Sequence, residues 1–148
     1  MRKLQVARLD RIAVCDGGKA LVLENIGDER FPSLRVRDSQ INILPRTSAM
    51  GRERPGRVHQ SANPARSSVE GTNLHERGEE VFLHSLVDQL NQAAEAGEFE
   101  HVVIVAPPHA LGLMRPRYSG TLRKRIRTEV AEDLVHCSVS EIELHLFG

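Results

Sequence analysis

An amphipathic stretch that leads into a short apolar run constrains the fold of this chain more than any other feature. Apolar residues recur every three or four positions across Leu74–Ala96, the period of a helix with one buried face. Asn73 and Glu76 can form a capping box at its start, and Gly97 stands where a helix commonly ends. The β-branched run His101–Ala106 then predicts a central strand covered on both faces, which indicates an α/β fold.

Three further strands are predicted in the first third of the chain. Arg8–Asp16 and Lys19–Ile26 are short apolar segments. The turn between them, Asp16-Gly17-Gly18-Lys19, contains two glycines, which tolerate the positive φ of a tight hairpin. Leu34–Leu44 alternates in part between apolar and polar residues and predicts a third strand. The first third is therefore expected to be an antiparallel meander.

The last third of the chain contains shorter elements. Leu111–Met114 predicts a turn of helix, Ser119 can cap another, and Ser138 begins a capping box that opens a third. Residues 127–135 allow two interpretations, because helical spacing continues to Leu134 while a strand there would complete the sheet. We expect a mixed sheet of three antiparallel strands followed by the order αβαβα, a plan that ribonuclease H-like domains share.

A long segment without apolar periodicity, Pro45–Gly71, separates the meander from the long helix. Its prolines and glycines predict no regular structure. Long loops of this kind inside compact domains are usually functional or disordered. We therefore expect one domain over residues 1–148, with residues 45–71 forming a flexible loop that is rich in arginine. The five arginines are Arg46, Arg52, Arg54, Arg57 and Arg66.

The charges of the chain are segregated although their sum is zero. It has 20 basic and 20 acidic residues. Between Met114 and Arg127 there are six basic residues and no acid, so a second basic patch is expected there. Aromatic residues make up only 3% of the chain, which leaves little for stacking on single-stranded bases.

The cysteines and the absence of long apolar runs bear on the compartment. Cys15 and Cys137 match no metal or redox spacing, and we interpret both as buried thiols in a reducing environment. We see no signal peptide and no segment long enough to cross a bilayer. We expect a soluble, cytoplasmic protein with no membrane partner.

Catalytic patterns are weak in this sequence. A ribonuclease H-like nuclease needs carboxylates from the first strand, the first helix and the end of the fourth strand. Asp10 or Asp16 could provide the first carboxylate, and Glu79 or Glu80 the second. The fourth strand, however, ends in Val105–His109, a stretch without a carboxylate. The histidines lack ligand spacing, and the turn after Val105 is interpreted as structural. No catalytic residue, metal or cofactor is therefore predicted.

Several short motifs stand out along the chain. They are Asp16-Gly17-Gly18-Lys19-Ala20, Arg54-Pro55-Gly56-Arg57, Val105-Ala106-Pro107-Pro108, Leu111-Gly112-Leu113 and Glu132-Asp133-Leu134-Val135-His136. Taken together, these motifs resemble the bacterial host attachment protein family, over roughly Leu9–Leu146. Glu132 stands where the family pattern usually carries lysine.

That family is in turn similar to the middle domain of the archaeal and eukaryotic peptide-chain release factor. The resemblance implies a strand at about Arg127–Leu134 and a mobile loop in the position of Pro45–Gly71. In the release factor this loop carries Gly-Gly-Gln and enters the peptidyl-transferase centre. The nearest string here is Gly56-Arg57-Val58-His59-Gln60, so peptidyl-tRNA hydrolysis is not carried over.

The resemblance and the charge pattern together predict non-catalytic binding of the ribosome or RNA in translation. Two alternatives stay open: a hydrolase of peptidyl-tRNA or RNA that uses His59 or Gln60, and an interaction module that presents a basic patch to an acidic protein. The predicted RNA-binding residues are Arg52, Arg54, Arg57, Gln60, Arg66, Arg115, Arg117, Arg123, Lys124 and Arg125.

Overall fold

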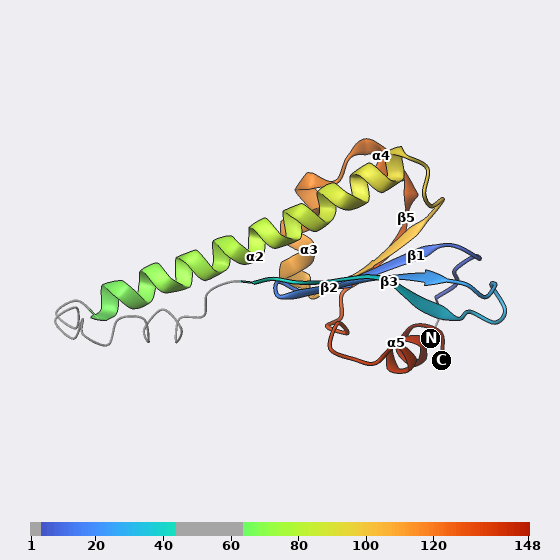
Figure 1. Ribbon diagram of the computed structural model, residues 1–148, viewed down its shortest axis with the longest axis horizontal. Helices are drawn as coiled ribbons and strands as arrows, with labels where there is room; N and C mark the ends of the chain where they lie inside the picture. Colours follow the sequence, from blue (N-terminus) through green and yellow to red (C-terminus); the bar gives the residue numbers. More distant parts are fainter. Residues whose placement is uncertain (1–3, 44–63) are drawn as a thin grey trace.

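One mixed sheet organises the molecule (Figure 1). The computed structural model describes residues 4–43 and 64–148, and the side chains of residues 4–43 and 74–148. The strands are β1 (Arg11–Cys15), β2 (Lys19–Asn25), β3 (Leu34–Ile41), β4 (Val102–Val105) and β5 (Ile126–Val130). The helices are α2 (Pro64–Glu95), α3 (Pro108–Met114), the 3₁₀ turn η2 (Arg115–Arg117), α4 (Gly120–Arg125) and α5 (Val139–Phe147).

The strands lie in the order β3-β2-β1-β4-β5, so their order in space differs from their order along the chain. β1 and β2 pair antiparallel, as do β2 and β3, whereas β4 is parallel to both β1 and β5. The predicted α/β class and the mixed sheet are confirmed. Between the two interpretations of residues 127–135, the structure selects a strand, and it is shorter than the resemblance implied.

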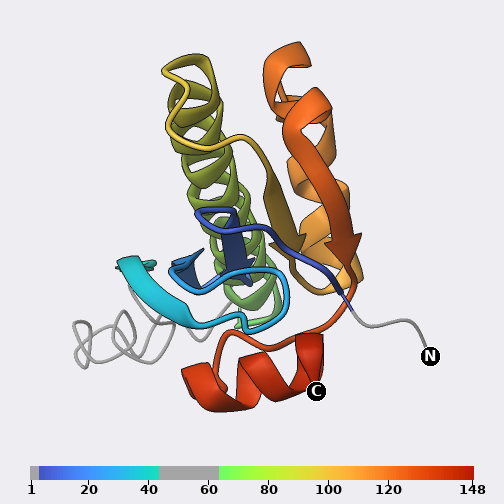
Figure 2. The same cartoon turned by 90° about the vertical axis from the view of Figure 1, so that its right-hand side faces the viewer.

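Helices cover both faces of the sheet (Figure 2). Alternation along β1 divides its side chains between two cores. Ala13 and Cys15 face the core formed with α2, α3 and α4, and Ile12 and Val14 face the core formed with α5. All residues of β4 are buried, as expected for a central strand with both faces covered.

The helix α2 begins earlier than predicted. The sequence predicted a start at Asn73 and excluded regular structure up to Gly71, yet the helix already contains residues 64–71. Pro64 is tolerated because the first residue of a helix needs no N–H partner, and a glycine inside a helix costs only about 1 kcal/mol. Asn73 and Glu76 therefore lie inside the helix, and the predicted capping box does not mark its start. The predicted end is confirmed, since Gly97 has φ +71°.

The first half of α2 projects beyond the sheet (Figure 1). Among its described side chains, Leu83 is the first that is fully buried, and Leu74–Arg77 are exposed all round. A helix of 32 residues is about 48 Å long, which is much longer than the strand β1 that it covers. The remaining part of the predicted loop, residues 45–63, lies outside the described residues.

Both cysteines are free. Cys15 is buried, as predicted, and burial raises the pKa of its thiol to about 12. Cys137 is only partly buried. Among the helices that the structure describes, none combines the length and the apolar character needed to cross a bilayer.

Candidate functional site

A cavity of about 410 Å³ lies at the carboxyl edge of the parallel strands. Asp16 follows β1, His109 lies just after β4, and Asp133 and His136 follow β5. Glu79 of α2 completes the polar lining. Parallel strands bring their carboxyl ends to one edge of the sheet, which is where ligands bind in open α/β folds.

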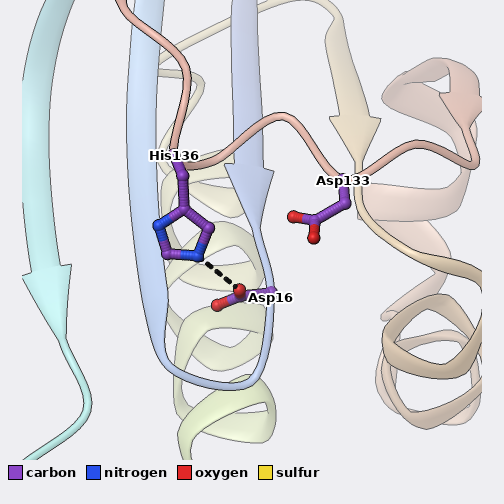
Figure 3. A group of neighbouring side chains, drawn as sticks. All are labelled: Asp16, Asp133 and His136. Atoms are coloured by element: carbon purple, nitrogen blue, oxygen red, sulfur yellow. Dashed lines mark hydrogen bonds and ion pairs between the residues drawn. The ribbon is translucent and has the colours of Figure 1, made fainter.

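Asp16 is held in a fixed orientation at this edge. Its Oδ1 accepts hydrogen bonds from the backbone N–H groups of Gly18 (2.8 Å) and Lys19 (2.9 Å). Its Oδ2 lies 3.1 Å from Nε2 of His136, and Asp133 lies beside this pair (Figure 3). The turn therefore uses one carboxylate oxygen and leaves the other directed toward the cavity.

Gly17 allows α2 to come close to this turn. A Cβ atom at Gly17 would lie 2.7–2.9 Å from side-chain atoms of Glu79, which is too close for real carbon atoms. The glycine thus permits Glu79 to reach the cavity.

Asn42 follows β3 and stands just before residues 44–63, the arginine-rich segment. Its backbone N–H donates to the carbonyl of Gly18 (2.9 Å), and its side-chain amide donates to the carbonyls of Gly17 (2.9 Å) and Gly78 (3.3 Å). Gly17 and Gly18 line the cavity. The chain therefore departs from the rim of the cavity, next to α2.

Two arginines of the second basic patch are paired with acids. Arg117 forms a bidentate contact with Asp88, with distances of 2.8 and 3.1 Å. Arg115 lies 2.8 Å from Glu129. The side-chain hydrogen bond that Arg117 donates to Asp88 raises the pKa of Arg117, and the one that Arg115 donates to Glu129 raises the pKa of Arg115. These two guanidinium groups already have carboxylate partners within the protein.

The other basic side chains of this patch lie on α4. Arg123 donates to the carbonyl of Arg115 (2.9 Å) and lies over the Tyr118 ring, and Arg125 donates to the carbonyl of Phe99 (3.1 Å). Lys124 is exposed. Because α4 directly precedes β5, this patch lies at the amino edge of the parallel strands, away from the cavity.

The Arg117–Asp88 pair gives a direct test of this arrangement. The hydrogen bond from Arg117 lowers the pKa of Asp88 below its ordinary value. The pair therefore stabilises the fold above the ordinary aspartate pKa, and this contribution is lost as the pH falls through the lowered value. In Arg117→Ala, we expect an NMR titration of the Asp88 carboxyl carbon to return toward the ordinary pKa. Lys124→Ala is the control and should leave it unchanged; an unaltered titration in Arg117→Ala would contradict the pairing.

The predicted RNA-binding residues thus fall into three groups. Arg52, Arg54, Arg57 and Gln60 lie outside the described residues. Arg66 lies on the first turns of α2 rather than in a loop. Arg115, Arg117, Arg123, Lys124 and Arg125 lie together on η2 and α4.

The sequence did not predict that Asp133 and His136 belong to the cavity. The carboxylate search examined the end of the fourth strand, but the acid at this edge follows the fifth. Of the alternatives considered, Asp16 and Glu79 line the cavity, whereas Asp10 is buried elsewhere and pairs with Arg127 (3.1 Å). The signal available was the position of Asp133 and His136 after a parallel strand, which places them at the same edge as Asp16.

Comparison with protein families finds a match over nearly the whole chain. The model of a family described as "Protein required for attachment to host cells" matches residues 11–146, nearly the whole chain. No curated protein matches the chain.

Proposed function

Since the chain belongs to the family of proteins required for attachment to host cells, we propose a biochemical role that this description leaves open. The protein binds RNA without cleaving it, and it acts in translation in the cytoplasm. The contact is made by the arginine-rich segment between β3 and α2, together with the start of α2.

One observation carries the proposal: the arginine-rich segment lies between a residue that is hydrogen-bonded to the sheet and a helix that projects from it. Asn42, just before the segment, is hydrogen-bonded to the β1–β2 turn, and the segment leads into α2, which begins at Pro64 and whose first turns project beyond the sheet. Residues 44–63 include four arginines and a single acid, Glu53. Arginine suits phosphate because its planar guanidinium group can donate two parallel hydrogen bonds.

The fold supports the translational setting by analogy. The strand order β3-β2-β1-β4-β5, with three antiparallel strands and two parallel additions, is the plan we expect of ribonuclease H-like domains. The proposed similarity to the release factor middle domain would put a loop before the long helix, in the position of this segment. The translational setting rests on this analogy, and the experiment below tests it.

The interaction-module alternative is less well supported by the geometry. Arg115 and Arg117 are engaged with Glu129 and Asp88, which reduces the positive charge that the patch on η2 and α4 offers to an acidic partner. The same pairing reduces the charge that this patch offers to RNA phosphates. We therefore assign the RNA contact to the arginine-rich segment.

The test compares two triple variants in RNA binding. For single-stranded RNA, each phosphate contact adds about 0.7 to the slope of log affinity against log salt. Replacing Arg52, Arg54 and Arg57 with alanine should flatten the slope by about 2 and lower affinity about 100-fold at 0.1 M salt. The matched variant replaces Arg115, Arg117 and Arg123 and should bind nearly as the wild type does. Fluorescence anisotropy at several salt concentrations gives both quantities.

Two results would overturn the proposal. One is wild-type RNA affinity that does not respond to salt, and the other is a loss confined to the variant of Arg115, Arg117 and Arg123. A peptidyl-tRNA cleavage assay separates the hydrolase alternative. Turnover by the wild type that is lost in Gln60→Ala would establish an enzyme in place of a binding protein.

A further inference from the structure

We propose that Asp16, Asp133 and His136 bind a divalent transition-metal ion such as Zn²⁺ or Mn²⁺. The inference goes beyond the proposed function, because ion binding requires neither RNA nor the segment 44–63. It arises from side chains that are far apart in sequence and meet at one edge of the sheet (Figure 3).

The geometry is close to that of a metal site. Each of the three residues offers one ligand atom, and these atoms all lie within 4.8 Å of one another. Two ligand atoms that are each about 2.1 Å from an ion lie about 3.4 Å apart in a tetrahedral site. Closing the set around an ion therefore requires a pair of ligand atoms to approach by at most about 1.4 Å. Asp133 and His136 are both exposed side chains on the segment after β5, which leaves them free to make such shifts.

The surroundings prepare Asp16 for this role. The backbone N–H groups of Gly18 and Lys19 bind Oδ1 and fix the orientation of the carboxylate. Hydrogen bonds of this kind to a ligating group orient it toward the ion. Oδ2 then faces His136, whose imidazole nitrogen lies 3.1 Å away. An ion would replace this contact by binding to both atoms.

The close approach of α2 brings a further acidic side chain to the cavity. Gly17 lacks the Cβ atom that would push Glu79 away, so a third carboxylate is brought to the same cavity. The lining then holds three carboxylates, from Asp16, Glu79 and Asp133, around a polar space. Like charges gathered around a cavity repel one another, and a cation there would offset that repulsion.

The type of donor selects the class of ion. Two carboxylate oxygens and one imidazole nitrogen suit Zn²⁺ or Mn²⁺, whereas Mg²⁺ prefers oxygen ligands alone and retains its water. Three protein ligands leave coordination positions open, and these would face the cavity that Glu79 and His109 line. An open position can accept water or an oxygen of a phosphate or carboxylate group.

Calorimetric titration of the full chain with Zn²⁺, after treatment with a chelator, tests the proposal. We expect binding of one ion per chain, with affinity reduced at least about tenfold in Asp133→Asn and in His136→Ala. The side chain of His136 is 68% exposed, so its replacement should leave the fold intact, which circular dichroism can verify. Mg²⁺ should bind more weakly than Zn²⁺.

The chain offers a matched control pair. Glu132 and His145 also place a carboxylate and an imidazole 3.9 Å apart at the surface, outside the cavity. Glu132→Gln and His145→Ala should bind Zn²⁺ as the wild type does. As a second readout, Mn²⁺ should broaden the NMR signals of His136 and His109 before those of His145.

The proposal is overturned if the wild type binds no Zn²⁺ up to 0.1 mM, or if both cavity variants retain full affinity. Broadening by Mn²⁺ that is strongest at His145 would have the same meaning. These outcomes are independent of RNA binding, which is measured with the arginine variants, so either proposal can fail while the other stands.

Discussion

Replacing Leu86 with alanine is expected to lower the free energy of unfolding by about 2–5 kcal/mol. Leu86 is 1% exposed and belongs to the core between α2 and the sheet, with Ala13 and Ile104. Truncation removes buried apolar atoms and leaves a cavity that rigid neighbours fill only in part. Because the second half of α2 provides the cover for this face, the loss affects the whole domain.

Chemical unfolding in urea measures this change, and Val81→Ala is the matched control. Val81 lies on the same helix but is 67% exposed, so its truncation should change the free energy of unfolding by no more than about 0.5 kcal/mol. Equal effects of the two substitutions would contradict the assignment of the buried face of α2.

A second large loss of stability, about 2–4 kcal/mol, is expected from Asn25→Ala. Asn25 is fully buried at the end of β2. Its side-chain oxygen accepts from the N–H groups of Gly27 (3.0 Å) and Ser33 (2.9 Å), and its amide nitrogen donates to carbonyls including that of Ala7 (3.1 Å). Alanine would leave several buried backbone groups without partners, and each costs about 1–3 kcal/mol.

Two further substitutions calibrate this result. Asn25→Asp keeps the oxygen that accepts from Gly27 and Ser33 but loses the donated bonds, and it also buries a charge, so it should remain clearly destabilising. Gln92→Ala replaces an exposed amide and should be nearly neutral. Thermal unfolding followed by circular dichroism compares all three, and an Asn25→Ala protein as stable as Gln92→Ala would show that this network does not stabilise the fold.

Much of the fold was predictable because its signals are local. The apolar segments of β1 and β2, the apolar run of β4 and the capping box at Ser138 each depend on neighbouring residues, and the structure contains all of them. The start of α2 was not predictable in this way. Proline and glycine were interpreted as breakers, yet Pro64 stands at the first position of the helix, where proline is favoured.

The candidate site was predictable only in part, because its residues meet through the topology of the sheet. Asp16 and His136 are 120 positions apart, and they come together since β1 and β5 are both parallel to β4. The sequence identified Asp16 and Glu79 as alternatives but gave no reason to add Asp133 until its strand was placed. The order of strands is a long-range property that local periodicity does not contain.

The basic patch on η2 and α4 shows a related limit. The cluster of arginines is evident from the sequence, but their partners are not. Asp88 lies on α2 and Glu129 on β5, 29 and 14 positions from the arginines that they bind. A run of like charges therefore indicates a charged surface, and only the structure shows how much of that charge is already neutralised.

Co-sedimentation with ribosomes is the most direct measurement of the central claim, that the arginine-rich segment between β3 and α2 binds RNA. The comparison uses the wild type and a variant in which residues 46–62 are replaced by a glycine-serine linker of equal length, which keeps α2 intact from Pro64. The wild type should pellet with ribosomes at low salt, and the linker variant should stay in the supernatant. A linker variant that pellets as fully as the wild type, or a wild type that does not pellet at all, would contradict the claim.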